Sequence, residues 1–455
     1  MHTLSTDLKE EVHLILSAQK PQTAWHYEAT IHTPEGDIDV LMVKVVDLYR
    51  DYTKNCTDQL TIDIMLGQGT YQQKVLAFAN ELEITLKRTQ MDGINSGQPS
   101  RYQTPEVVRY RALAMDKERP LLGGKKAVKL SVENADTANV VVARFQLLDL
   151  LFEQVRMKTF GGSLRRCTGV DAIHAILGSQ CQSIDVSSFG KLLGVDVAPK
   201  ANPEVREHIV IPHLTPLDKL PRLIDNICGG IYPAGFGYYL QGKHWYLYPL
   251  YDFERFTTTE NTLTVLIPPE RSAMDLETTF RVTPTQVIIL SSGQSLTEDT
   301  TDHQQLKEGN TTAFMDAKRI LEGFVDIEGE TVKLDATKNV NQFASSVRPT
   351  GLQMLKESPN RITNNYLTES AMLAKREGIG LVIKWENSVE NLIYPGMPVR
   401  ILYLKNNVTH TVYGVVHTTD THTSGRSPTI SSPRHTSNTA IGIFVNRLLS
   451  KEIPT

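Results

Sequence analysis

Residues 394–418 read YPGMPVRILYLKNNVTHTVYGVVHT, and this stretch goes furthest towards deciding the fold class. A Pro-Gly pair opens it, and the runs 398–404 and 411–418 are rich in β-branched and aromatic residues, which is typical of strands. Residues 380–385 upstream and 441–445 downstream have the same character. The C-terminal part of the chain is therefore predicted to be β-structure.

Residues 419–439, between two of these strands, are dominated by Thr, Ser, Pro and His. This composition predicts a long loop. Because the stretch has almost no apolar side chains, it is expected to bury little apolar area and to serve assembly rather than folding.

The N-terminal region also reads mostly as strands, because apolar and polar residues alternate there with a period of two. A cluster of Gly, Pro, Asn and Ser at 89–101 then predicts a loop. A small antiparallel sheet or barrel accounts for this region. The predicted strands are 12–16, where Ile15 breaks the alternation, 25–33, 37–49, 59–66 and 83–88, with one short helix at 70–79.

Two helices have clear signals in the middle of the chain. Thr168 and Asp171 have the spacing of a capping box and begin a helix that Gly178 is expected to end. A second helix is predicted from about Leu220 to Cys228, because proline is tolerated in a first turn and Gly229-Gly230 follows. The other predictions are strands at 106–114, 126–132, 262–267 and 286–290, strand or helix at 140–151, a hairpin over 236–248 and a helix at 311–321.

The composition excludes several classes of protein. The chain has 455 residues, which favours two to four domains, and its 40% hydrophobic and 22% charged residues are typical of a globular protein. The net charge of −4 argues against nucleic-acid readout, which usually needs a basic excess. No segment resembles a membrane span or a secretory leader. Four scattered cysteines without a Cys-x-x-Cys pair predict reduced thiols rather than a disulfide framework or a zinc site.

Three local patterns resemble active-site motifs but are better explained as turns. Gly67-Gln68-Gly69 lacks the third glycine of a dinucleotide fingerprint, and no βαβ unit follows it. Gly123-Gly124-Lys125-Lys126 lacks the upstream glycine and the Ser or Thr of a P-loop. Glu328 and Glu330 flank a glycine in a setting that would not shift a carboxyl pKa. None of the three argues for an enzyme.

The C-terminal histidines are the one candidate for a metal site. His410, His417, His422 and His435 lie in this region together with Asp420. Zinc would need several of these imidazoles on one strand face, but an unbroken strand places His417 and His422 on opposite faces. We therefore predict no metal dependence, and assign no catalytic, cofactor-binding or metal-binding residues and no cofactor.

Nine aromatic residues fall between Tyr232 and Phe253, which is a much higher density than the 7% of the whole chain. Such rings stack on flat ligands in some proteins. Cross-strand packing within a hairpin is the favoured interpretation, because aromatic pairs stabilise antiparallel strands.

Three stretches together resemble the central baseplate hub of contractile-tail bacteriophages. They are Asp47-Leu48-Tyr49 with its flanking strands, the helix–glycine–hairpin segment 216–254, and 394–400 leading to 412–417. The resemblance implies an α+β, mainly β fold with two tube-protein-like antiparallel β-barrel domains and mixed α/β connecting and inserted domains. The implied division is a first barrel at 1–100, a mixed connecting domain at 101–205, a discontinuous second barrel at 206–255 and 376–455, and an inserted mixed domain at 256–375.

The resemblance also implies a structural virion protein that is not an enzyme. Such hubs form a homotrimer whose pseudo-sixfold ring joins the hexameric tail tube to the trimeric spike during genome ejection. The implied partners are the central spike protein and tail-tube or tube-initiator proteins, with the tape-measure protein as a further candidate. DNA would pass only as cargo, there would be no membrane anchor, and the protein would be assembled in the bacterial host cytoplasm into the virion baseplate. Two alternatives stay open: a tail-associated hydrolase, or the hub of a related contractile secretion system.

Overall fold

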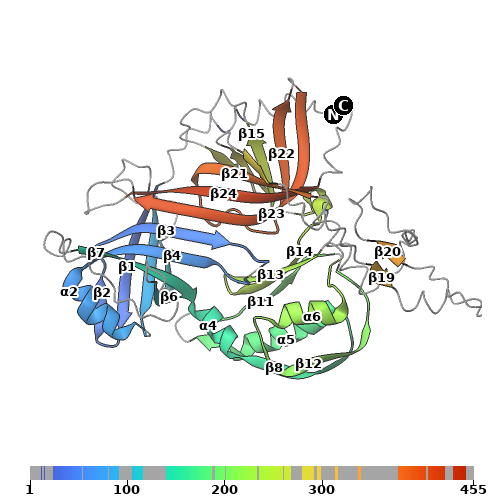
Figure 1. The fold of residues 1–455 in the computed structure, drawn as a ribbon, viewed down its shortest axis with the longest axis horizontal. Helices are drawn as coiled ribbons and strands as arrows, with labels where there is room; N and C mark the ends of the chain where they lie inside the picture. Colours follow the sequence, from blue (N-terminus) through green and yellow to red (C-terminus); the bar gives the residue numbers. More distant parts are fainter. Residues whose placement is uncertain are drawn as a thin grey trace, which may run out of the picture.

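The fold described here is that of a computed structural model. It is mainly β, with few helices, and most strands belong to one large mixed sheet (Figure 1). The residues that the structure describes are 12, 15, 24–53, 55–79, 81–91, 105–115, 140–186, 190–199, 201–232, 235–259, 261–267, 279–291, 295–298, 313–315, 337–339, 378–405, 408–425 and 434–446.

One part of the large sheet closes on itself through backbone pairing. Starting from β3, each strand pairs with the next in the order β3-β4-β7-β6-β5-β1-β24-β23, and β23 pairs again with β3. We call these eight strands the first circuit. Their bounds are β1 (Ala24–Thr33), β3 (Met42–Arg50), β4 (Gln59–Gly67), β5 (Glu83–Met91), β6 (Glu106–Met115), β7 (Val140–Asp149), β23 (Val408–Gly425) and β24 (His435–Asn446).

The other part of the large sheet also contains the long strands β23 and β24. Its order is β16-β17-β15-β22-β23-β24-β21-β18, with β15 parallel to both β17 and β22. We call these strands the second half. Near its ends, Trp385 Nε1 donates to Thr279 Oγ1 over 3.0 Å, and that hydroxyl donates to the Glu386 carbonyl over 2.8 Å. The new strands are β15 (Thr262–Ile267), β16 (Phe280–Val282), β17 (Gln286–Leu290), β18 (Ser295–Glu298), β21 (Gly378–Ser388) and β22 (Pro398–Lys405).

A third part, drawn in green in Figure 1, packs helices on small sheets. Helices α5 and α6 lie along a two-stranded ribbon of β8 and β12, and β11 pairs in parallel with the hairpin β13–β14. The bounds are α4 (Leu150–Met157), β8 (Thr159–Cys167), α5 (Gly169–Ser183), β9 (Asp185–Val186), β10 (Gly190–Lys191), β11 (Gly194–Val197), β12 (Arg206–Pro216), α6 (Leu220–Cys228), β13 (Phe236–Gln241) and β14 (His244–Pro249).

Between residues 24 and 446, the remaining elements that the structure describes are short. They are β2 (Gly36–Asp39), which pairs with β1, the pair β19 (Ala313–Met315) and β20 (Thr337–Asn339), and four helical turns. These turns are α2 (Gln68–Thr70), a π-helical turn at Tyr71–Val75, and 3₁₀ turns at Leu76–Phe78 and Phe253–Thr257.

Each of the three parts has its own hydrophobic core. Ile62, Ile64 and Phe145 are fully buried in the core of the first circuit, and Trp385 with Ile443 lies in that of the second half. Apolar side chains from α4, α5, α6 and the hairpin form the third core around Trp245. Separate cores of this kind are typical of a chain built from several domains.

Much of the predicted secondary structure is confirmed. The strands of the N-terminal and C-terminal regions, the helical segment at 70–79 and the hairpin over 236–248 are present. Thr168 and Asp171 form the predicted capping box, and Gly229 ends α6 in a left-handed conformation. The open choice at 140–151 resolves as a strand that passes into helix α4 at Leu150. The predicted strand 126–132 lies outside the described residues.

The prediction of a long loop at 419–439 is wrong. Residues 419–425 belong to β23 and 435–439 to β24, and the two segments pair with each other. Thr421, Thr423, Ser437 and Thr439 are buried, and their hydroxyls bond across the pair at 2.8–2.9 Å. A polar segment can therefore belong to a core, provided that its side chains satisfy each other.

Three smaller predictions also need correction. Within the predicted helix 311–321, the described residues 313–315 form strand β19. Helix α5 continues past Gly178 to Ser183, because a glycine inside a helix costs only about 1 kcal/mol. Val12 and Ile15, in a region predicted to be strand, are helical.

Candidate functional site at the junction of the sheet parts

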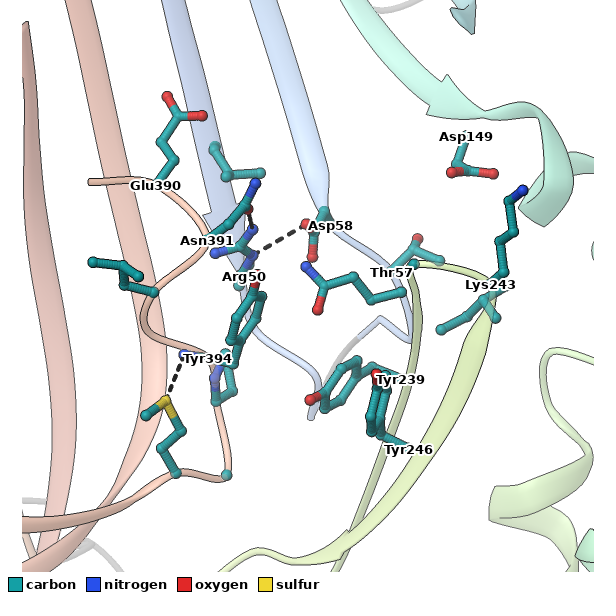
Figure 2. Close-up of a pocket in the computed structure, with 18 of the residues that line it drawn as sticks. Arg50, Thr57, Asp58, Asp149, Tyr239, Lys243, Tyr246, Glu390, Asn391 and Tyr394 are labelled. Carbon is teal, nitrogen blue, oxygen red and sulfur yellow. Dashed lines mark hydrogen bonds and ion pairs between the residues drawn. The ribbon is translucent and has the colours of Figure 1, made fainter. Parts of the chain in front are cut away.

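A cavity of about 1270 Å³ lies where the first circuit, the second half and the hairpin β13–β14 meet. We call it the junction pocket. Figure 2 shows three groups of side chains around it: Arg50 and Asp58 from the first circuit, Glu390, Asn391 and Tyr394 from the β21–β22 loop, and Tyr239, Lys243 and Tyr246 from the hairpin.

Arg50, the last residue of β3, is the centre of one wall. Its side chain is only 2% exposed, and its Nε donates to Asp58 Oδ2 over 3.1 Å. Its Nη2 donates to Asn391 Oδ1 over 2.6 Å, and its guanidinium lies 4.6 Å from the ring centre of Tyr394. Burial lowers the pKa of Arg50, but the charge and hydrogen bond of Asp58 together with the nearby phenols of Tyr52 and Tyr394 outweigh it and hold that pKa above its ordinary value. The arginine therefore fastens the β21–β22 loop to the first circuit as a permanent cation.

Glu390, in the same loop, makes a second set of contacts with strands of the first circuit. Its carboxylate accepts hydrogen bonds from Tyr27 and Thr423, each over 2.8 Å, and from Arg88 Nη1 over 2.6 Å. The guanidinium of Arg88 also lies 4.6 Å from the ring centre of Trp25. A buried carboxylate is tolerated only with such partners, since burying an unpaired charge costs several kcal/mol.

The opposite wall is aromatic. Tyr239 stacks on Tyr246 across the hairpin, with ring centres 4.8 Å apart, and on Tyr52 at 4.2 Å. Tyr52 donates a hydrogen bond to Asp58, so the carboxylate that pairs with Arg50 also holds this wall. Burial raises the pKa of Tyr239 above its ordinary value, so the phenol stays neutral.

Asp149 also lines the pocket, and it caps the N-terminus of helix α4. Its Oδ1 accepts from the backbone amides of Leu151, over 2.7 Å, and Phe152, over 3.1 Å. Burial raises the pKa of Asp149, although these two amide bonds act in the opposite direction.

The charged groups described above hold structural elements together. Arg50, Asp58, Arg88, Glu390 and Asp149 each take part in an ion pair, a hydrogen bond to a neighbouring segment or a helix cap. Such an arrangement suits a rigid joint between parts of the chain.

The four C-terminal histidines each contact a different residue. His422 Nδ1 is 2.5 Å from Asp47 Oδ1, and His435 Nε2 donates to the Val43 carbonyl over 2.7 Å. His417 stacks on Tyr251, and His410 stacks on Tyr403. Asp420 lies beside Asp47 and His422, and burial raises its pKa. Within the described part of the chain, no three His, Cys, Asp or Glu side chains come together as a metal site would require.

The remaining candidates from the sequence are the aromatic run and the three turn-like motifs. They either pack within the fold or lie outside the described residues. The aromatic run packs as the hairpin interpretation predicts, with Phe236, Tyr238 and Trp245 in a hydrophobic core. Gly67 ends β4, and α2 follows it directly. Residues 123–126, 328 and 330 lie outside the described residues.

The fastening residues of the junction pocket were not recognised in the sequence. Arg50 and Asn391 are 341 positions apart, and Arg88 and Glu390 are 302 positions apart. No local spacing can reveal such a pair. The nearest signals were the Asp47-Leu48-Tyr49 strand, which ends at Arg50, and the Pro395-Gly396 turn after Asn391.

No family model matches the chain, and none of the curated proteins does. Solved structures do match. A tail protein from Neisseria meningitidis MC58 is 11% identical, with a TM-score of 0.45, over 93% of this chain and 98% of that one. The 43 kDa tail protein of prophage MuSo2 from Shewanella oneidensis is 8% identical, with a TM-score of 0.45, over 92% and 98%.

A chain of a Francisella PdpA–VgrG complex in its lidded form is 10% identical, with a TM-score of 0.43, over 99% of this chain and 57% of that one. Phage tail proteins, the class to which the sequence resemblance points, are thus among the structures that the chain matches. With identities of 8–11% and TM-scores below 0.5, these matches are a likeness of structure alone. No helix among the described residues is long and apolar enough to span a membrane.

Proposed function

We propose that this chain is the central hub of a phage tail baseplate and forms a trimeric ring between the tail tube and the spike. The observation that carries the proposal is the repeated use of β23 and β24. These strands complete the first circuit of eight strands and also belong to the eight strands of the second half.

Two such units in one chain would allow a threefold ring to match a sixfold tube. A closed ring of identical subunits repeats one interface by rotation. Three chains with two similar units each can present six units to a sixfold tube, while the opposite face keeps threefold symmetry for a spike. Near-neutral net charge is compatible with packing many copies together.

The proposal includes a division into domains. The first tube-like barrel is assigned to 1–100, the connecting domain to 101–205, the second barrel to 206–255 with 376–455, and an insertion to 256–375. Since β6 and β7 pair with β5 and β4, the connecting domain would supply strands to the first barrel. The separate cores of the first circuit and the second half support two units. Since β15 and β17 pair with the sheet that contains β22, the insertion would supply strands to the second barrel.

The proposed role is non-enzymatic. The buried hydrogen bond from Arg50 to Asn391 and the ion pair of Arg88 with Glu390 favour a rigid connector, because they hold the β21–β22 loop against the first circuit. The proposed partners are two further copies of this chain, a spike protein, and tail-tube or tube-initiator proteins, with the tape-measure protein as a further candidate. DNA would pass through the ring as cargo. The proposed location is the virion baseplate, after assembly in the host cytoplasm.

Mass photometry of the purified chain, alone and with spike and tube proteins from the same tail, tests the proposal. We expect a species of three times the monomer mass, and negative-stain images that show a ring with six similar lobes on one face. A chain that stays monomeric at micromolar concentration in the presence of both partners would contradict the hub role.

A further inference from the structure

We propose that Cys167 and Cys228 are a dithiol pair that closes into a disulfide under oxidising conditions and ties the end of β8 to the end of α6. Both residues carry free thiols in this structure. The inference concerns the α/β part of the chain and stands independently of the hub role.

The ribbon β8–β12 places the Cys167 side chain on the side of the helix. Cys167 lies directly opposite Arg206 in the antiparallel register. Residues directly opposite each other project their side chains to the same face of a sheet. Arg206 extends its guanidinium from that face to the end of α6, where Nη2 donates to the Cys228 carbonyl over 2.8 Å. Cys167 therefore faces the same helix end.

Helix α6 directs the Cys228 thiol towards the chain that follows Cys167. An ideal Cβ atom built on Gly169 would lie 3.2 Å from Cys228 Sγ and 3.3 Å from Cys228 Cβ. Gly169 is two residues after Cys167 and begins helix α5. The side chain of Cys167 packs against the same hydrophobic cluster that contains Cys228. The Cys228 thiol and the Cys167 side chain thus both lie next to the short segment 167–169.

Exposure decides which thiol reacts first. Cys228 is 3% exposed, whereas Cys167 is partly exposed. Burial raises the pKa of Cys228 to about 11, and a charge on Cys167 contributes in the same direction. Burial also raises the pKa of Cys167. Since the thiolate is the reactive form, both thiols should react slowly near neutral pH and faster at higher pH.

The reaction with oxidised glutathione balances in two steps. The Cys167 thiolate attacks one sulfur of oxidised glutathione, forms a mixed disulfide and releases one glutathione thiolate. The Cys228 thiolate then attacks Cys167 Sγ and releases the second glutathione. Two protons leave the protein, its two thiols are oxidised to one disulfide, and one oxidised glutathione is reduced to two glutathiones.

The disulfide would enclose α5, β12 and α6 in a covalent loop. Closing a long loop restricts the unfolded chain and stabilises the folded state. A reducing cytosol would keep the pair open, and an oxidising medium outside the cell would close it.

The test is to incubate the reduced full chain with oxidised glutathione at pH of about 9 and to measure its intact mass. We expect the loss of two hydrogens, a peptide that links Cys167 to Cys228, and a thermal unfolding midpoint that rises by several degrees and falls back on reduction. Cys167→Ser should abolish the linked peptide, and so should Cys228→Ala, while Cys56→Ser should leave it in place.

Three results would overturn the proposal. The first is a wild-type protein that stops at a single glutathione adduct on Cys167, because the buried thiol would then be out of reach. The second is a disulfide that joins a different pair of cysteines, and the third is no reaction at all. These readouts use the monomeric or assembled chain equally, so they do not depend on trimer formation.

Discussion

Replacing Glu390 by Gln should loosen the joint between the β21–β22 loop and the first circuit. The Glu390 side chain is 7% exposed and that of its partner Arg88 is 13% exposed. The substitution keeps the shape and removes the charge, so the carboxylate still paired with Arg88 is that of Glu106, whose side chain is 50% exposed, and the contact with the Trp25 ring is kept. Removing one partner of a buried ion pair costs about 3–5 kcal/mol, and a charge-assisted hydrogen bond contributes about 1.5–3 kcal/mol. Because Arg88 keeps one partner, we expect a loss of about 2–4 kcal/mol.

Glu106→Gln is the matched control, since it removes the other carboxylate from the same arginine. An exposed ion pair contributes at most about 1 kcal/mol, so this variant should unfold close to wild type. Urea unfolding followed by tryptophan fluorescence is a suitable assay, because Trp25 lies against Arg88. If Glu390→Gln unfolds no earlier than Glu106→Gln, the carboxylate does not fasten the loop and our account of the joint is wrong.

Two further predictions concern the same region. Gly396 has a φ of +93°, and a Cβ there would lie 2.5 Å from ring atoms of Tyr248, so Gly396→Ala should cost about 1–3 kcal/mol. Gly69→Ala, with nothing within 4 Å, should be neutral, and equal urea midpoints for the two variants would contradict this account. Burial lowers the pKa of His435 below 6.5, so the unfolded chain binds more protons and stability should fall as pH drops through about 6.5 towards the folded-state pKa. His435→Gln should show a weaker decline of the thermal midpoint between pH of about 7.5 and 5.5, and an unchanged decline would show that other groups cause it.

Local signals predicted the elements that depend on local chemistry. The capping box at Thr168 and the glycines after Cys228 mark helix ends through backbone hydrogen bonds that neighbouring residues satisfy. Strands β8 and β12 were missed, because Gly161-Gly162 and Pro212 interrupt patterns whose outer face is exposed. Long-range pairing was beyond any local pattern. The contact between Arg88 and Glu390 exists only because the sheet brings distant segments together.

The hydroxyl-rich ends of β23 and β24 show why polarity alone misled the prediction at 419–439. Along the first part of β23, Val412 and Val416 face an apolar core. The register shifts between Val416 and Thr418, and beyond this bulge Thr419, Thr421 and Thr423 are buried instead. That end of the strand pairs with β3 and meets the Glu390 carboxylate, which needs hydrogen-bond donors that valine cannot provide. The change from valine to threonine thus follows from what each end of the shared strand packs against, an apolar core at one end and a buried charge at the other.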